Sequence, residues 1–188
     1  MKRAVILTFA ATAMLIGGCP TDPTAGSSGQ GLPAGSDTQQ GGLPECERDW
    51  HDENIGVGVN PPAGATGPIG NPLADTPWFV AEWTGQDGRA YSVAVQDAPG
   101  TTLETVVQFN RDVIPMLGGA VLEDRALEFA NGETGWVLVA SAPAGSLIDA
   151  FYYRHGHLFD VGVADVSGAT EEEWEVINDF IESLCVDP

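Results

Sequence analysis

Three histidines are the side chains of this 188-residue chain best suited to metal chemistry. His155 and His157 flank a single glycine in "HGH", and His51 lies in the acidic stretch "DWHDEN". If the three imidazoles converged beside the carboxylates of that stretch, they could bind zinc or copper. The histidine pair, however, falls where a turn between two strands is expected, and turn histidines are commonly solvated. We therefore treat a metal-binding protein or a metal-dependent enzyme that uses these three histidines as an alternative function and not as the main prediction.

Acidic residues in the expected strands are the second candidates, because a buried carboxyl group with a shifted pKa can act as a general acid or base. Glu82, Glu123 and Asp160 occupy such positions, but alternation of polar and apolar residues explains each as solvent-facing. The sequence has no Gly-x-Ser-x-Gly motif, and its glycine clusters precede no Lys-Ser or Lys-Thr pair that would bind phosphate. We therefore predict a protein that is not an enzyme and has no cofactor.

Residues 1–18 have the organisation of a secretory signal peptide. Lys2 and Arg3 precede an apolar segment, Ala4–Gly18, that as a helix would span about 22 Å, short of the roughly 30 Å hydrocarbon core of a membrane. The segment leads into "IGGC", which resembles the bacterial lipobox, with isoleucine where leucine is commoner. The resemblance implies cleavage before Cys19 and transfer of diacylglycerol to its thiol. An ordinary signal peptide beside a coincidental cysteine is the alternative.

The two other cysteines, Cys46 and Cys185, are expected to form a disulfide, because an even pair in an exported protein is usually oxidised. This bond would fasten the start of the folded domain to its last helix. Two free thiols with redox chemistry are the alternative, but the pair lacks Cys-x-x-Cys spacing.

The predicted mature chain is strongly acidic. It keeps five arginines, no lysine and all 27 acidic residues, a formal charge of −22 before termini and histidines. Such a surface repels nucleic acid and anionic lipid headgroups, so neither is an expected direct partner. We expect the membrane to be contacted through lipid on Cys19, and the partner to be an envelope protein or a small molecule. Solubility alone, or adaptation to salt, also explains the acidity.

Composition divides the chain after its signal into a linker and one domain. Residues 19–45 are rich in Gly, Ser, Thr, Gln and Pro and contain no aromatic residue, which is typical of a flexible linker. We predict a single disulfide-fastened domain over residues 46–188, with a regular core at about 77–185. A short strand near Ile55–Val59 and a Gly- and Pro-rich surface loop up to Pro77 would precede that core.

Apolar spacing and turn signals predict strands and two amphipathic helices in the order β-β-α-β-β-β-β-α. Thr101 with Glu104, and Thr170 with Glu173, have the spacing of capping boxes at the two helix starts. The expected buried stripes are Leu103, Val106, Val107, Ile114 and Leu117 in the first helix, and Trp174, Val176, Ile177, Phe180, Ile181 and Leu184 in the second. The strands are expected at 78–83, 90–95, 120–129, 136–141, 147–154 and 158–164. The fold class is α+β, an antiparallel sheet of about six strands flanked by two helices.

Four stretches of the chain resemble the PsbP-type α-β-α sandwich. They are "PGTTLETVVQFN", "GWVLVA", "DAFYYRHGHLFDVGVA" and the closing "WEVINDFIESL". The resemblance spans roughly Trp78–Leu184 and implies an accessory or binding role. Together with the lipobox it predicts a lipoprotein of the bacterial cell envelope whose domain binds or assists another envelope component.

Overall fold

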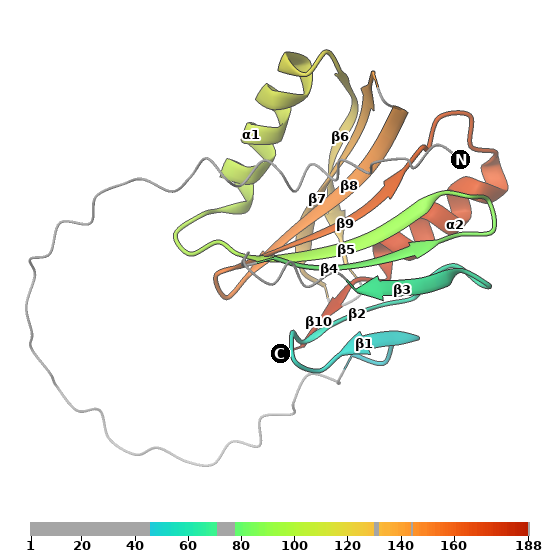
Figure 1. Cartoon of the computed structure of the whole chain (residues 1–188). Coiled ribbons are helices and arrows are strands. Elements are labelled where there is room, and N and C mark those ends of the chain that lie inside the picture. Colours follow the sequence, from blue (N-terminus) through green and yellow to red (C-terminus); the bar gives the residue numbers. More distant parts are fainter. Residues whose placement is uncertain (1–45, 71–77, 130–131, 144, 188) are drawn as a thin grey trace, which may run out of the picture.

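A computed structural model describes residues 46–70, 78–129, 132–143 and 145–187. The predicted signal peptide, Cys19 and the linker 19–45 lie outside these residues. The described residues form ten strands and two helices (Figure 1). The elements are β1 (Trp50–Asp52), β2 (Val57–Val59), β3 (Thr66–Gly70), β4 (Trp78–Thr84), β5 (Ala90–Asp97), α1 (Leu103–Met116), β6 (Ala120–Glu128), β7 (Thr134–Ala142), β8 (Gly145–Arg154), β9 (His157–Ala164), α2 (Glu171–Glu182) and β10 (Cys185–Val186).

Seven strands form one antiparallel sheet in the order β3-β4-β5-β9-β8-β7-β6. The predicted α+β class is confirmed, and so is the predicted order of elements from β4 to α2. The additional strand is β3, which lies in the stretch expected to be a loop. Each of its five residues is exposed and three of them are Gly or Pro, so neither alternation nor β-propensity marked it as a strand.

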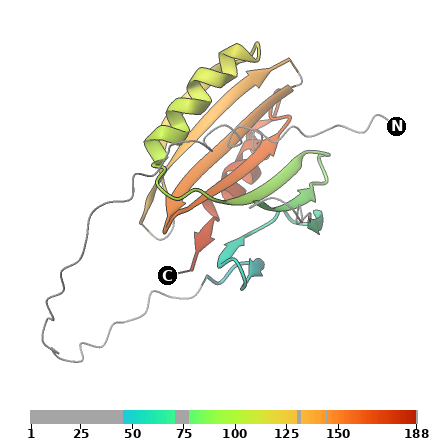
Figure 2. The ribbon, with the colours of Figure 1, turned by 60° about the vertical axis from the view of Figure 1, so that its left-hand side comes forward.

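The two helices cover opposite faces of this sheet (Figures 1 and 2). Helix α2 packs over the apolar face built by β5, β7, β8 and β9, where Phe180 meets Tyr91 edge-to-face at 5.2 Å between ring centroids. Helix α1 packs Val107 and Ile114 over the face of β7 and β8 that carries Leu138 and Phe151.

The helix starts agree with the predicted capping in one case out of two. At α2, the Thr170 hydroxyl accepts from the Glu173 N–H and the Glu173 carboxylate accepts from the Thr170 N–H, as predicted. At α1 the N-cap is Thr102 rather than Thr101, because the N–H of Thr101 donates to the carbonyl of Ala98 in the preceding turn. The cap therefore forms one residue later, without a capping box.

Two residues of the predicted buried stripes are exposed. Leu117 follows the last residue of α1, and Val176 lies on the solvent side of α2. In α1 a polar residue takes an inward position instead, since buried Asn110 donates its side-chain N–H to the Val106 carbonyl at 3.0 Å. That internal hydrogen bond satisfies the amide and lets the helix bury it.

A second sheet, of three short strands in the order β1-β2-β10, closes the lower end of the α2 face (Figure 2). Val57 and Val59 of its middle strand are fully buried in the core beneath α2. The predicted disulfide between Cys46 and Cys185 is present and joins the chain that leads into β1 to strand β10. By the chain-entropy relation, closing a loop of 139 residues stabilises the folded state by up to about 5 kcal/mol.

A buried arginine joins the β4–β5 turn to the start of α2. The guanidinium of Arg89 lies 2.8 Å from a carboxylate oxygen of Asp87 and 2.9 Å from one of Glu173, and it donates to the Asp165 carbonyl. Tyr91 donates its hydroxyl to the same Asp87 carboxylate at 3.0 Å. The hydrogen bond from Arg89 holds the pKa of Glu173 at about 2, so this carboxylate stays charged across the physiological range.

We predict that Arg89→Met lowers the free energy of unfolding by about 3 kcal/mol, because it leaves the partly buried Asp87 carboxylate without its cation. Urea unfolding at pH 7 measures the change. Arg125→Met is the matched control, since Arg125 pairs with Glu123 on an exposed strand and its loss should cost less than about 0.5 kcal/mol. Equal effects of the two substitutions would contradict a structural role for Arg89.

Candidate functional site

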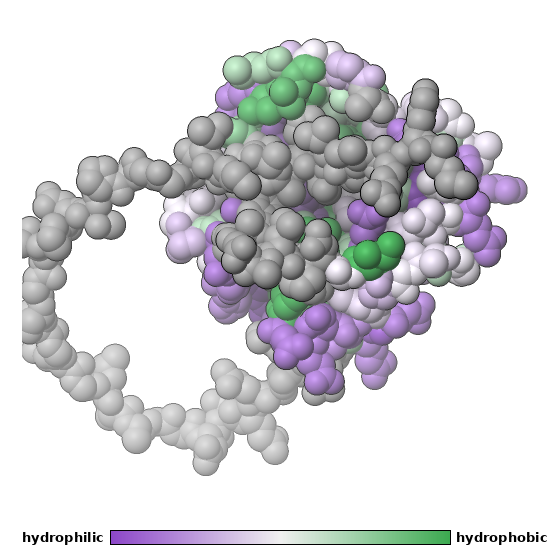
Figure 3. All heavy atoms as spheres, viewed as in Figure 1, coloured by the Kyte–Doolittle hydropathy of each residue, from purple (hydrophilic) through white to green (hydrophobic). Residues whose placement is uncertain are grey.

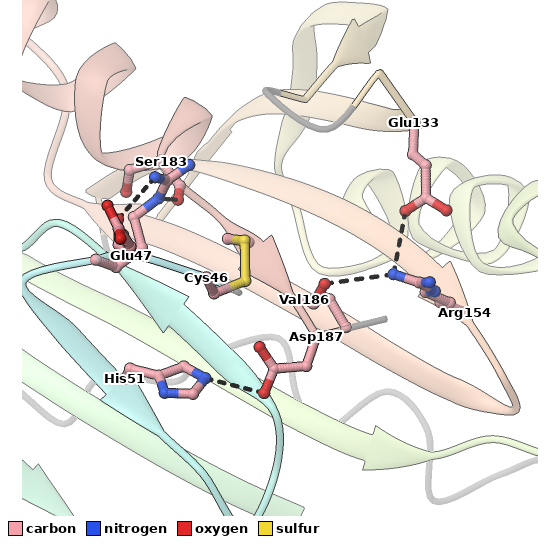
Figure 4. Close-up of a disulfide and its surroundings, with 10 residues drawn as sticks. Cys46, Glu47, His51, Glu133, Arg154, Ser183, Val186 and Asp187 are labelled. Atoms are coloured by element: carbon pink, nitrogen blue, oxygen red, sulfur yellow. Dashed lines mark hydrogen bonds and ion pairs between the residues drawn. A yellow bond between two sulfur atoms is a disulfide. The ribbon is translucent and has the colours of Figure 1, made fainter. Parts of the chain in front are cut away.

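A pocket of about 340 Å³ opens where three segments meet at the lower end of the molecule. The β1–β2 turn supplies Glu53 to Gly56, and β10 with the residue after it supplies Val186 and Asp187. The β8–β9 hairpin supplies Arg154, His155, His157 and Phe159. Figure 4 shows Asp187 and Val186 between the disulfide, which ties β10 to the start of the domain, and Arg154, which reaches the Val186 carbonyl. On the face seen in Figure 3, hydrophilic residues predominate at the lower edge of the domain.

The turn "HGH" shapes one wall of the pocket. His155 and Gly156 have φ angles of +52° and +85°, and Arg154 pairs with His157 across them. Positive φ at both central residues is the geometry of the tight two-residue turns that suit twisted hairpins. The turn places His155 and His157 at the pocket while exposing both, and Nδ1 of His157 lies 2.8 Å from a carboxylate oxygen of Asp97.

The third histidine approaches the same pocket from the small sheet. Nε2 of His51 lies 3.1 Å from a carboxylate oxygen of Asp187, whose backbone N–H donates to the carbonyl of Gly56 at 2.8 Å (Figure 4). His155 and His157 therefore line the pocket, and His51 contacts it only through Asp187. His51 and His157 each face a different carboxylate. Within the described residues no group of three or more His, Cys, Asp or Glu side chains is placed to hold a metal ion. The alternative metal site of His51, His155 and His157 is thus not assembled among these residues.

Arg154 links the hairpin to β10. Its guanidinium donates to the Val186 carbonyl at 3.3 Å and lies 3.8 Å from a carboxylate oxygen of Glu133 (Figure 4). The side chain is mostly buried. It therefore contributes a fixed positive charge to a pocket that also contains the carboxylates of Glu53 and Asp187.

The strand acids lie in three different environments. Glu123 is exposed and pairs with Arg125, as the alternation predicted, and Glu82 is half-buried. Asp160 is buried, so its assignment to solvent was wrong. It lies in β9 near a second buried carboxyl, Asp149 of β8, which the sequence analysis missed.

Burial raises the pKa of Asp149 to about 7. Burial and the neighbouring Asp149 charge together raise the pKa of Asp160 well above its ordinary value. Asp149 opposes Gly162 across the β8–β9 pair, and a Cβ at position 162 would collide with its carboxylate oxygen. The glycine therefore makes the room into which this carboxyl extends. An available signal was the position of both acids within otherwise apolar strands, "SLIDAFYY" and "HLFDVGVA".

We predict that the change in the free energy of unfolding caused by Asp149→Asn is a few kcal/mol more favourable at pH 8 than at pH 4.5. A carboxyl group whose pKa is raised by folding makes its full contribution to the free energy of unfolding below its unfolded pKa of about 4. That contribution is lost as the pH rises through its folded pKa near 7. Asparagine does not titrate, so its advantage grows across this window. Urea unfolding at half-unit pH steps measures it, with the exposed Glu128→Gln as control. A difference between variant and parent that is constant with pH would contradict the assignment.

No helix among the described residues combines the length and the apolar character needed to cross a membrane. No protein-family model matches the chain, and no curated protein matches it in sequence. Comparison with solved structures does find matches. The solution structure of cyanobacterial PsbP (CyanoP) from Synechocystis sp. PCC 6803 aligns over 73% of this chain and 90% of its own, with a TM-score of 0.52 and 14% identity. The domain has a PsbP-like fold.

A second match is the crystal structure of LpqN, described as involved in cell envelope biogenesis of Mycobacterium tuberculosis. It aligns over 70% of this chain and 83% of its own, with a TM-score of 0.41 and 13% identity. At 14% identity, the likeness to CyanoP establishes the fold of the domain and does not establish its function. The predicted resemblance to the PsbP-type sandwich is thereby confirmed as a statement about fold.

Proposed function

We propose that this chain is a bacterial envelope lipoprotein whose PsbP-like domain acts as a non-catalytic binding module, tethered to a membrane by lipid on Cys19. The signal-like residues 1–18 and the "IGGC" stretch support the tether, and the composition of residues 19–45 suits a linker that lets the domain swivel. Acyl chains on one terminus hold a protein at a membrane because each buried CH₂ contributes roughly 0.8 kcal/mol.

The pocket beside the disulfide is the observation that carries the binding role. Its walls come from the β1–β2 turn, the β8–β9 hairpin and the chain after β10, and the Cys46–Cys185 bond fixes the last of these to the start of the domain. A wall that is fixed before binding loses little conformational entropy when a ligand arrives. The arginine and histidines of the pocket can donate hydrogen bonds to a polar partner, and its carboxylates can accept them.

The ion pairs at the pocket favour recognition over catalysis. His157 is paired with Asp97, His51 with Asp187, and Arg154 donates to the Val186 carbonyl. Side chains held in this way keep a fixed pattern of charge. The partner that we propose is a component of the envelope, either a protein or a small polar molecule. Nucleic acid and anionic lipid headgroups are not proposed as partners, because the strongly negative chain would repel them.

We predict that a photo-crosslinking residue at position 53, on the exposed pocket wall, captures a partner in cells of the source organism. The adduct should appear in the membrane fraction, and its mass separates a protein partner from a small molecule.

With Cys19→Ser the chain should move to the soluble fraction, because the thiol that accepts the lipid is gone.

The matched control carries the crosslinker at position 128, an exposed glutamate on edge strand β6. Equal capture at positions 53 and 128, or no capture at position 53, would argue against the pocket as the binding site. Retention of Cys19→Ser in the membrane would refute the lipid tether separately.

A further inference from the structure

Strand β6 lies at one end of the main sheet and, among the described residues, pairs only with β7. Seven of its nine residues are exposed, and its sequence, "AVLEDRALE", contains neither proline nor glycine. The opposite edge, β3, has only five residues and includes Pro68, which has no N–H to give to a further strand. Of the two edges, β6 is therefore the one whose backbone suits pairing with a strand from another chain.

Exposed apolar side chains gather at the start of this edge. Met116 is the last residue of α1 and Leu117 follows it, and they are 81% and 54% exposed. Leu122 of β6 is 64% exposed and lies at an irregularity of the β6–β7 register, without a partner in β7. Hydrophobic residues are visible at the upper end of α1 in Figure 3. Exposed apolar side chains that are grouped in this way are typical of an interaction surface.

The charges beside this apolar group balance one another. Nε of Arg125 lies 2.6 Å from a carboxylate oxygen of Glu123, and the guanidinium of Arg111 donates to both carboxylate oxygens of Asp124, at 2.6 and 2.8 Å. Residues 116–127 contain two acids and one arginine, and Arg111 offsets the remaining charge. This edge therefore lacks the excess negative charge of the chain as a whole, and it repels an acidic molecule less than the rest of the surface does.

The order of the charges in β6 is self-complementary. Glu123 and Arg125 lie on the face of β6 that is turned to α2, because Arg125 opposes Val137 of the core beneath that helix. Asp124 lies on the other face, opposite Leu138. When two copies of β6 run antiparallel about a two-fold axis at Asp124, Glu123 of each copy opposes Arg125 of the other, on the same face of the sheet. Opposite charges in directly opposed positions stabilise a strand pair.

We propose that β6 pairs in this register with β6 of a second copy of this chain. The register brings Leu122 near Ala126 of the second copy at both ends of the contact, which covers the exposed leucine. The two Asp124 side chains meet at the axis, where each is already paired with Arg111. The pairing joins two seven-stranded sheets and leaves only their β3 edges, at which Pro68 disfavours a further strand, so the assembly closes as a dimer.

The two-fold axis also suits copies that are held in one membrane. It stands perpendicular to the sheet, so it leaves every residue on its own side of the sheet. Cys46 is bonded to β10 of the small sheet, which lies on the α2 side, and both copies would therefore begin on the same side. Tethering would then raise the effective concentration of each copy for the other. This last support rests on the proposed lipid tether, whereas the contact itself does not.

Sedimentation velocity of the purified full-length chain, with detergent micelles in molar excess, tests the contact between about 1 µM and 200 µM. We expect a reversible equilibrium between monomer and dimer. Arg125→Glu should weaken dimerisation at least tenfold, because Glu123 would then face a glutamate of the second copy. The double variant Glu123→Arg with Arg125→Glu should restore it to within threefold, because the reversed pair is again self-complementary.

A second pair of variants tests the apolar part of the contact. Leu122→Glu should weaken dimerisation at least tenfold, and Val176→Glu, at an exposed valine of α2, by less than twofold. A chain that is monomeric throughout the range, or a dimer that Arg125→Glu and Leu122→Glu leave intact, would overturn the proposal. A crosslinked adduct of two copies from position 128 reports this dimer and is not capture of the pocket's partner, so the two proposals fail separately.

Discussion

The fold depends on covering both faces of a seven-stranded sheet with only two helices. On one face α2 supplies Ile177, Phe180 and Ile181, but a helix of twelve residues cannot reach the whole width of the sheet. The small β1-β2-β10 sheet covers the remainder and buries Val57 and Val59. Trp50 of β1 packs edge-to-face on Trp83 of β4, with 5.1 Å between ring centroids. Strands of two and three residues are too short to hold this position alone, so the Cys46–Cys185 bond secures them.

The opposite face is completed in another way. Arg111 of α1 fixes the helix over β6 and β7, since its guanidinium forms two hydrogen bonds with Asp124 and stacks over Trp136 at 5.3 Å. Beyond the helix, polar side chains occupy the face where apolar ones would stabilise the domain more. Keeping two carboxyl groups buried side by side opposes folding at neutral pH. That cost distinguishes this face of the sheet from the apolar face under α2.

The regular elements from β4 to α2 could be predicted from the sequence because their signals are local. The Asp87-Gly88 turn, the capping box of Thr170 and the "HGH" turn are each set by neighbouring residues. The strands β1 and β10 were not predicted because they have only three and two residues, and β10 pairs with β2 across most of the length of the domain. A metal site of three converging histidines was the alternative prediction, but the fold gives His51 and His157 separate carboxylate partners. Asp160 was assigned to solvent because alternation cannot reveal that both faces of its strand are covered.

The most direct test is amide hydrogen exchange before and after selective reduction of the disulfide. We predict that reduction releases the small sheet and one wall of the pocket. Protection should be lost in β1, β2, β10 and the β8–β9 turn, while the central strands β5, β8 and β9 keep theirs. Unchanged exchange in β1, β2 and β10, or uniform loss throughout the domain, would contradict the claim that the disulfide specifically secures the sheet that completes both the core and the pocket.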